Sequence, residues 1–356
     1  MRHAIALAFL FGAAAAAGQQ PWSVGARGHY GFLWAHRSAS WILVEGHAGA
    51  TELHAERRVA GHRPWHRAYA LPSYGFIALH TRMANPARIG DAAGLLPYLA
   101  LPLAQGPRLA LRLRLGWGVG WVSRPYDRLD NNRQIAIGSR LNTAIQLMPE
   151  LRWARGRTAI TAAVGLDHWS NGSAKQPNLG LNFLSAALGA SYALRPASAA
   201  VPAPDTTAYE RAQRELSVVG ALGLSESGRP LNGQRTVLSL SAHLSWRKGR
   251  KGALGAGVDL FNKGDLPTVH AELAGKPRAA FTQLGIHAGG ALLFGRAELL
   301  LHFGAYALSP VPDDAPVYQR IGARYRIGRH LLAGISLKTH FAAADHWELG
   351  LGYRWP

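Results

Sequence analysis

Residues 109–121 read LALRLRLGWGVGW. Every odd position in this stretch holds a large apolar residue, and every even position holds Ala, Arg or Gly. Side chains of a β-strand alternate between the two faces of a sheet, whereas an α-helix would scatter these Leu residues around its circumference. The stretch therefore predicts a strand with one oily face and one polar or small face.

The C-terminal stretch shows the same alternation. Aromatic residues stand at both ends of its apolar row, as the two interfacial girdles around the oily band of a membrane barrel require. An aromatic residue almost at the C-terminus also resembles the terminal signal of outer-membrane barrels, although Pro356 follows it here. The apolar row consists of Trp347, Leu349, Leu351, Tyr353 and Trp355, and the opposite face holds Glu348, Gly350, Gly352 and Arg354.

Similar segments recur along the whole chain and predict an all-β fold, a transmembrane antiparallel up-and-down β-barrel. We count about sixteen strands, with twelve or fourteen as alternatives because the early segments are weakly patterned; closure favours an even number. The segments lie near 24–34, 48–59, 74–82, 95–103, 108–122, 138–154, 158–170, 182–195, 214–226, 235–248, 252–262, 279–294, 297–308, 317–327, 330–341 and 346–355.

Short and long connections alternate between these segments, as the periplasmic turns and external loops of a barrel do. The alternation breaks at the Pro/Ala-rich stretch 196–213, which is either a periplasmic linker or a boundary between two halves. The short links lie at 105–107, 155–157, 249–251, 295–296 and 328–329, and the long ones at 123–137, 171–181, 227–234, 263–278 and 309–316.

The N-terminus is typical of a secretory signal peptide, residues 1–18. A short basic start precedes an unbroken apolar run from Ala4 to Ala17, and small residues end this run before Gln19. The run is too short to span a bilayer comfortably as a helix. We therefore expect residues 19–356 to form the barrel, in the outer membrane of a Gram-negative bacterium.

The formal net charge of +19 comes from Arg residues scattered through apolar-alternating segments. A soluble nucleic-acid binder usually clusters such charge on one face, so nucleic acid is not an expected partner. Anionic lipid, lipopolysaccharide phosphate or a water-filled polar lumen fits the pattern better. The chain has no Cys, which excludes disulfides and thiolate metal sites.

One hairpin carries a combination of residues that could catalyse a reaction. In segment 158–170 the oily face continues in alternation to His168 and Ser170, and the parity of the return strand places Asn182 on the same face. Polar groups directed at hydrocarbon are costly unless they have a task or a partner. A His beside a Ser on one strand face is the arrangement that base activation of a hydroxyl requires.

The sequence His168-x-Ser170-Asn171, followed by Pro177-Asn178-x-Gly180, resembles the lipid A 3-O-deacylase (PagL-type) family, also described as acyloxyacyl hydrolase-like, and is closest to its larger-barrel members. The resemblance implies an outer-membrane ester hydrolase with a Ser/His/Glu triad. It makes Ser170 the nucleophile and His168 the general base and acid. It makes Asn171, Gly172 and Asn178 candidates for supporting the oxyanion.

The family's Glu position corresponds to Asn182, which is a departure. A neutral amide can accept the imidazole N–H and hold the ring, but it cannot stabilise an imidazolium by charge. Asp167 is near in sequence but belongs to the opposite strand face. We therefore do not expect its carboxylate to take the role of the family's Glu.

We therefore expect an esterase that removes an ester-linked acyl chain from lipid A, acting toward the outer leaflet and needing no metal or cofactor. Basic loop residues are expected to pair with lipid A phosphates. The alternative is a non-catalytic porin-like or structural outer-membrane barrel. His62 and His66 have helical ligand spacing, but Pro64 lies between them, so we interpret them as a loop without metal. The basic loop residues are Arg124, Arg128, Arg133 and Lys175.

Overall fold

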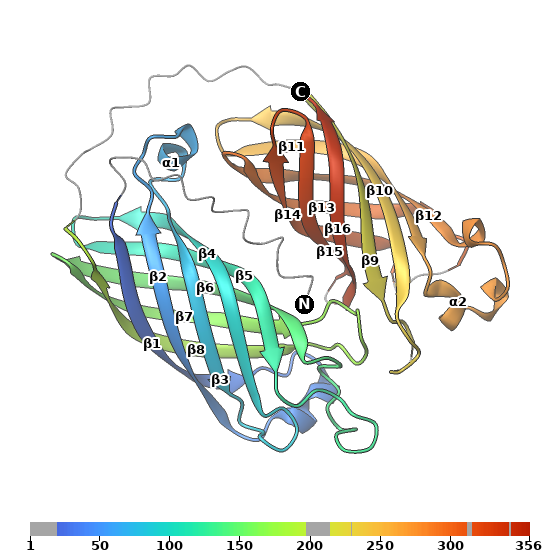
Figure 1. The fold of residues 1–356 in the computed structure, drawn as a ribbon, viewed down its shortest axis with the longest axis horizontal. Helices are drawn as coiled ribbons and strands as arrows, with labels where there is room; N and C mark the ends of the chain where they lie inside the picture. Colours follow the sequence, from blue (N-terminus) through green and yellow to red (C-terminus); the bar gives the residue numbers. More distant parts are fainter. Residues whose placement is uncertain (1–19, 197–213, 229, 312–314, 342) are drawn as a thin grey trace. The chain divides into compact units, whose positions relative to one another are not determined.

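The computed structural model describes residues 20–196, 214–228, 230–311, 315–341 and 343–356. They form sixteen antiparallel strands, which close into two separate barrels of eight strands each (Figure 1). The chain divides into two compact units, each of which contains one of the barrels. Among the described residues, no helix is both long and apolar enough to cross a membrane.

The first barrel contains β1 to β8. It closes because β8 pairs back onto β1, with Phe32 opposite Leu184 and Tyr30 opposite Ala186. The short helices η2 (Ser38–Leu43) and α1 (Pro64–Ala68) lie in its connections. Its strands are β1 (Trp22–Leu33), β2 (His47–Arg58), β3 (Ser73–Arg82), β4 (Asp91–Gln105), β5 (Leu109–Val122), β6 (Leu141–Arg155), β7 (Thr158–Ser170) and β8 (Leu181–Ala193).

The second barrel contains β9 to β16. It closes between its last and first strands, with Leu351 opposite Gly220. The connection between β11 and β12 carries α2 (Leu266–Val269), η3 (Ala271–Leu273) and η4 (Arg278–Phe281). The strands are β9 (Arg214–Ser225), β10 (Arg235–Lys248), β11 (Gly252–Lys263), β12 (Thr282–Phe294), β13 (Ala297–Leu308), β14 (Val317–Ile327), β15 (Leu331–His340) and β16 (Ala343–Trp355).

The expected antiparallel fold and the count of sixteen strands are confirmed, but the strands close as two barrels rather than as one. No described strand of one barrel pairs with a strand of the other. Strand alternation is a local property, and it does not specify which strands meet at closure. The stretch 196–213 falls between β8 and β9; residues 197–213 lie outside the described part of the chain, as does the expected signal peptide 1–18.

The two faces of each strand follow the alternation of the sequence. On β5, Leu109 is 48% exposed and Trp121 is 43% exposed on the outside of the barrel, whereas Arg112 and Arg114 are buried in the lumen. Leu349 and Leu351 of β16 are likewise exposed. An outward apolar band with inward polar residues is the arrangement of a barrel surrounded by lipid.

Ion pairs fill the lumen of the first barrel. Arg114 lies 2.8 Å from the carboxylate of Glu52, and Arg27 lies 2.5 Å from that of Glu150. Arg112 joins Glu150 to Glu56 of β2, at 2.8 Å from Glu56. An eight-stranded barrel has an interior just wide enough for side chains, so these pairs occupy the space that a channel would need.

The lumen of the second barrel has its own network. Arg320 binds the carboxylates of Asp259 and Glu348, each at 2.8 Å. Lys263 and Lys338 both pair with Asp345, at 2.8 and 2.5 Å. Buried charges that are paired in this way avoid most of the cost of desolvation.

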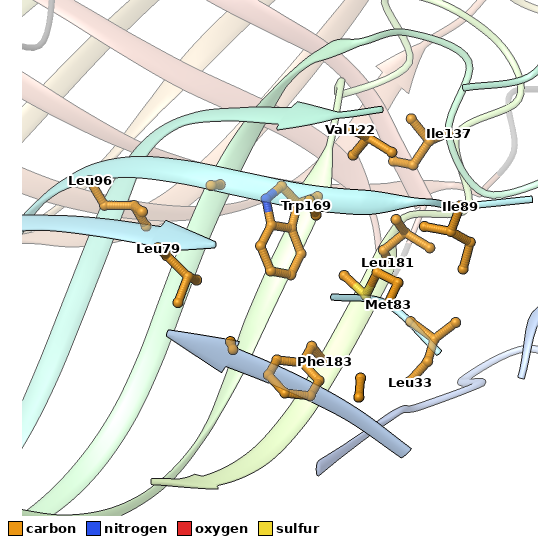
Figure 2. Packing of buried hydrophobic residues seen from close by; sticks show 14 of the residues in the cluster. Leu33, Leu79, Met83, Ile89, Leu96, Val122, Ile137, Trp169, Leu181 and Phe183 are labelled. Atoms are coloured by element: carbon orange, nitrogen blue, oxygen red, sulfur yellow. The ribbon is translucent and has the colours of Figure 1, made fainter. Parts of the chain in front are cut away.

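An apolar cluster fills one end of the first barrel, inside the connections that follow β1, β3, β5 and β7 (Figure 2). Trp169 of β7 and Phe183 of β8 point into it, and both are fully buried. Loop residues Ile89 and Ile137 complete the packing, also without exposure. The cluster therefore fixes the ends of β7 and β8, where the hairpin predicted to carry the chemistry lies.

Candidate active site

The end of β7 and the start of β8 position the candidate residues. Trp169 is buried in the apolar cluster, and its indole N–H donates to the Ala93 carbonyl at 3.0 Å. Because neighbouring strand residues point to opposite faces, His168 and Ser170 turn outward. His168 pairs in register with Asn182 of β8. All three side chains thus lie on the outward face at the same end of the hairpin.

His168 and Asn182 are joined directly. The Asn182 Oδ1 lies 2.6 Å from the His168 Nδ1, and its Nδ2 lies 2.7 Å from the Nδ1 of His36. An amide oxygen only accepts hydrogen bonds, so the His168 Nδ1 must donate. An amide nitrogen only donates, so the His36 Nδ1 must accept. In its neutral form His168 therefore carries its proton on Nδ1 and presents the lone pair of Nε2.

His36 follows β1 in the connection to β2, which the closure between β8 and β1 brings to the site. The Trp34 N–H donates to the Asn182 carbonyl at 2.8 Å, two residues before His36. Burial lowers the pKa of His36 below 6.5, and the neighbouring positive charge of Arg37 lowers it further. The ring is therefore neutral at neutral pH, the form in which Nδ1 can accept the amide N–H.

Gly180 allows His168 to occupy its place. A Cβ at position 180 would stand 2.6 Å from the His168 Cε1, and the backbone has φ of +80°, a region that favours glycine. The Gly180 N–H also donates to the Ala136 carbonyl at 2.9 Å, which ties the loop to the connection before β6. A side chain larger than that of glycine at position 180 of the sequence motif would therefore clash with His168.

Ser170 is 7% exposed and contacts Asn178. The two side chains exchange hydrogen bonds, with the Ser170 Oγ 3.1 Å from the Asn178 Oδ1 and 3.0 Å from the Nδ2. The same Oδ1 accepts the Asn171 backbone N–H at 2.9 Å. Asn178 therefore links the candidate nucleophile to the loop that follows it.

Asn171, Gly172 and Asp167 were also considered from the sequence, and each has a different environment. The Asn171 side chain turns to Ser139, whose Oγ accepts its Nδ2 N–H at 3.0 Å. Gly172 has φ of +62° at the turn. Asp167 faces the lumen, as its strand parity predicts, and accepts from the Gln146 side chain at 2.9 Å. This carboxylate therefore points away from His168.

Exposed basic side chains surround this end of the first barrel. Arg37 belongs to the connection after β1, and Arg124, Arg128 and Arg133 belong to the connection after β5. Both connections leave the barrel at the end where Ser170 lies, because the strands run antiparallel. Lys175, in the loop between β7 and β8, is exposed as well.

Sequence reasoning missed His36. The residue lies outside any alternating segment, and its neighbours Trp34 and Arg37 belong to no motif. Only the closure of β8 onto β1 places it against Asn182. A predicted hairpin register cannot reveal such a contact, because it comes from strands far apart in sequence.

Comparison with known proteins matches each barrel separately. The lipid A 3-O-deacylase (PagL) family matches residues 49–191, which include His168, Ser170 and Asn182. The acyloxyacyl hydrolase C-terminal domain matches residues 214–356, the whole of the second barrel. The chain belongs to the PagL-type family. The architecture and the family together point to an outer-membrane protein whose relatives are lipid A deacylases.

Other comparisons add little to this PagL-type assignment. No curated protein matches the chain. Two similar solved structures are a triple mutant and a second mutant of the Rhodopseudomonas blastica porin; each is 9% identical, with a TM-score of 0.19, and the alignment covers 94% of this chain and 100% of the porin.

Proposed function

We propose that this PagL-type protein hydrolyses an ester-linked acyl chain of lipid A, with Ser170 as nucleophile and His168 as general base. The hydrogen bond between the His168 Nδ1 and the Asn182 Oδ1 carries the proposal. It leaves the Nε2 lone pair of His168 on the strand face that also presents Ser170.

The reaction follows from this arrangement. In the reaction the Ser170 hydroxyl turns from the Asn178 Oδ1 to the His168 Nε2. Its Oγ then attacks the carbonyl carbon of the ester while the proton passes to that nitrogen. The tetrahedral oxyanion collapses to an acyl-serine, and the imidazolium returns its proton to the departing sugar oxygen. Water then attacks the acyl-serine with the same base and releases the fatty acid. Donors on Asn171, Gly172 and Asn178 are the candidates for binding the oxyanion.

Asn182 does the work of an orienting group without a charge. Its amide holds His168 in the tautomer that the first proton transfer needs. Because a neutral amide does not stabilise the imidazolium electrostatically, we expect slower turnover than with the carboxylate of the family. His36 adds the second restraint, since it accepts from the Asn182 Nδ2 and keeps the Oδ1 turned toward His168.

The outward position of the site suits a substrate that stays in the membrane. An acyl ester of lipid A reaches Ser170 from the outer leaflet without leaving the bilayer. The exposed Arg37, Arg124 and Arg128 supply positive charge for the lipid A phosphates at the same end of the barrel. Lipopolysaccharide is therefore the proposed partner, with the active site toward the outer leaflet.

The test is lipid A analysis by mass spectrometry after incubation of the refolded protein with lipopolysaccharide. We expect the wild type to release one acyl chain, and Ser170→Ala to lose at least about 10³-fold in kcat, as removal of a catalytic serine does. Ser191→Ala, at the other end of β8, is the matched control and should retain activity. Unchanged lipid A with folded wild type, or full activity in Ser170→Ala, would contradict the proposal.

A further inference from the structure

Three histidines meet in the lumen of the second barrel, apart from the proposed catalytic site. His243 comes from β10, His287 from β12 and His302 from β13, and all three are buried. One ring nitrogen of each lies within 4.8 Å of the corresponding atoms of the others. Residues from three strands thus converge on one point.

The lumen orients one of these rings for coordination. The His287 Nδ1 lies 2.8 Å from the Asp259 Oδ2, so its proton is held by the carboxylate and its Nε2 carries the lone pair. Asp259 is itself fixed by Arg320 at 2.8 Å and by the Tyr318 hydroxyl at 2.5 Å. A carboxylate behind a histidine is the usual support for a metal ligand, because it sets the tautomer and raises the ligand's basicity.

In the other two rings, the Nδ1 atoms are not hydrogen-bonded to a carboxylate. The His243 Nδ1 lies 2.9 Å from the His287 Nε2, a contact between two imidazoles. The His302 Nδ1 is buried and has no hydrogen-bond partner among the described residues. The rings of His243 and His302 stack at 4.5 Å between centroids. A buried polar atom without a partner costs free energy, which a bound cation would recover.

We propose that these three histidines bind one divalent transition-metal ion, with Zn²⁺ as the reference ion. Imidazole nitrogens are ligands for Zn²⁺ at about 2.0–2.1 Å, which sets tetrahedral ligand nitrogens about 3.3–3.4 Å apart. In the structure the three rings are stacked, with interplanar angles of 8–16°, and the nitrogens lie within 4.8 Å of one another. Because the lone pair of an imidazole nitrogen lies in the plane of its ring, the rings must turn out of this stack to share an ion. When the ion binds, the His243 Nδ1 gives up the proton that it donates to His287 and the His243 Nε2 takes up a proton, so the ligand stays a neutral imidazole.

The lumen also gives the ion charge balance and access. The two arginines near the site are paired with carboxylates. Arg320 pairs with Asp259 and Glu348, and Arg324 pairs with Glu298. His243 and His302 line two adjoining cavities of the lumen. Three protein ligands leave a further coordination position, which water from these cavities fills.

The experiment uses the full mature protein, refolded in detergent, stripped with a chelator and dialysed against Zn²⁺ or Co²⁺. Elemental analysis is expected to find a single equivalent of Zn²⁺, and Co²⁺ is expected to give the visible absorption of a low-coordinate histidine site. His302→Phe keeps the volume of the ring and removes its nitrogens, so affinity should fall by at least about tenfold. His270→Ala, in the connection between β11 and β12, is the matched control and should bind like wild type.

Heat-dependent mobility in electrophoresis identifies folded barrels, so only folded protein is compared. If His302→Phe does not fold, His302→Gln tests the same position with a polar side chain, and it too should lose affinity. A folded wild type that binds no Zn²⁺ above the level of these variants overturns the proposal. Equal binding by the wild type and the His302 variants overturns it as well. The proposed Ser/His mechanism uses no metal, so the outcome of the lipid A assay does not bear on this test.

Discussion

In the proposed mechanism, a single amide side chain sets the tautomer of the general base. Asn182 uses both of its polar atoms, one toward His168 and the other toward His36. If the amide turned around, its nitrogen would face the His168 Nδ1, and His168 would have to accept there and carry its proton on Nε2. The base would then point its lone pair away from Ser170. The orientation of this amide is therefore a condition for the proposed proton transfer.

Substitutions of His36 test this condition. His36→Phe removes the acceptor and lets the amide rotate, so kcat should fall by about 10- to 100-fold because the base loses its alignment. His36→Gln offers a side-chain oxygen to the same amide N–H and should restore most of the rate. KM should change little in both variants, since His36 does not touch the lipid in this mechanism.

Steady-state kinetics on lipopolysaccharide measures the difference. A merely structural role for His36 predicts that Phe and Gln reduce activity alike, or that melting changes in parallel with rate. Equal rates in wild type and His36→Phe would exclude His36 as a positioning residue.

The shared strand face of the proposed triad residues could be predicted from sequence, because strand parity and a short motif point to the same positions. The parity of β7 separates His168 and Ser170 from Asp167 and Trp169, and the structure has the same separation. His36 was not accessible, because its contact depends on the closure of the barrel. Ring tautomers were likewise out of reach, since they follow from distances within a network of side chains.

At the scale of elements, most strand boundaries could be predicted within a few residues. The segment expected at 158–170 is β7 (Thr158–Ser170), and that expected at 346–355 is the end of β16. β4 begins at Asp91, four residues before the expected 95. Its first residues include Ala92, Ala93 and Gly94, which are too small to give a clear alternation. Pattern reasoning thus works where large apolar residues mark the outward face.

Gly180, in the loop between β7 and β8, can be tested against a control glycine, Gly156, in the turn between β6 and β7. Gly180→Ala and Gly156→Ala both place a Cβ on a backbone with positive φ, +80° and +60°, so each should lose about 1–3 kcal/mol of stability. Only Gly180→Ala also pushes on His168, whereas nothing lies within 4 Å of a Cβ at Gly156. We expect Gly180→Ala to lose about 10²-fold in activity and Gly156→Ala to keep it.

Deacylation rates, compared at matched fractions of folded protein, give the result. A similar loss of activity in both glycine variants would mean that loop strain, rather than the position of His168, limits the reaction.

At the scale of the whole molecule, sixteen amphipathic strands are compatible with one wide barrel or with two narrow ones. The sequence pattern does not separate these arrangements, because it describes faces and not neighbours. The pairings of β8 with β1 and of β16 with β9 show that the chain forms two narrow barrels. The histidine cluster was hidden for the same reason, since its members lie on three strands and share no motif.

Closure into two narrow barrels determines what the lumens can do. A single sixteen-stranded barrel would leave an aqueous channel, whereas eight strands leave room for side chains and small cavities between them. Arg114 and Glu52 fill the first lumen with no exposure of either side chain, and Arg320 and Asp259 lie across the second. These paired charges lie across the path that a porin-like channel would need.

Reconstitution into planar bilayers tests this consequence. We expect no stepwise conductance of porin size from the folded protein, because an ion would have to displace paired buried charges, each of which costs several kcal/mol to strip of its partner. A porin inserted under the same conditions is the positive control for the measurement, and Ser170→Ala should be as silent as wild type because the catalytic face lies outside the barrel. Regular steps that grow in number with the amount of folded protein would contradict the filled lumen and return the channel function to consideration.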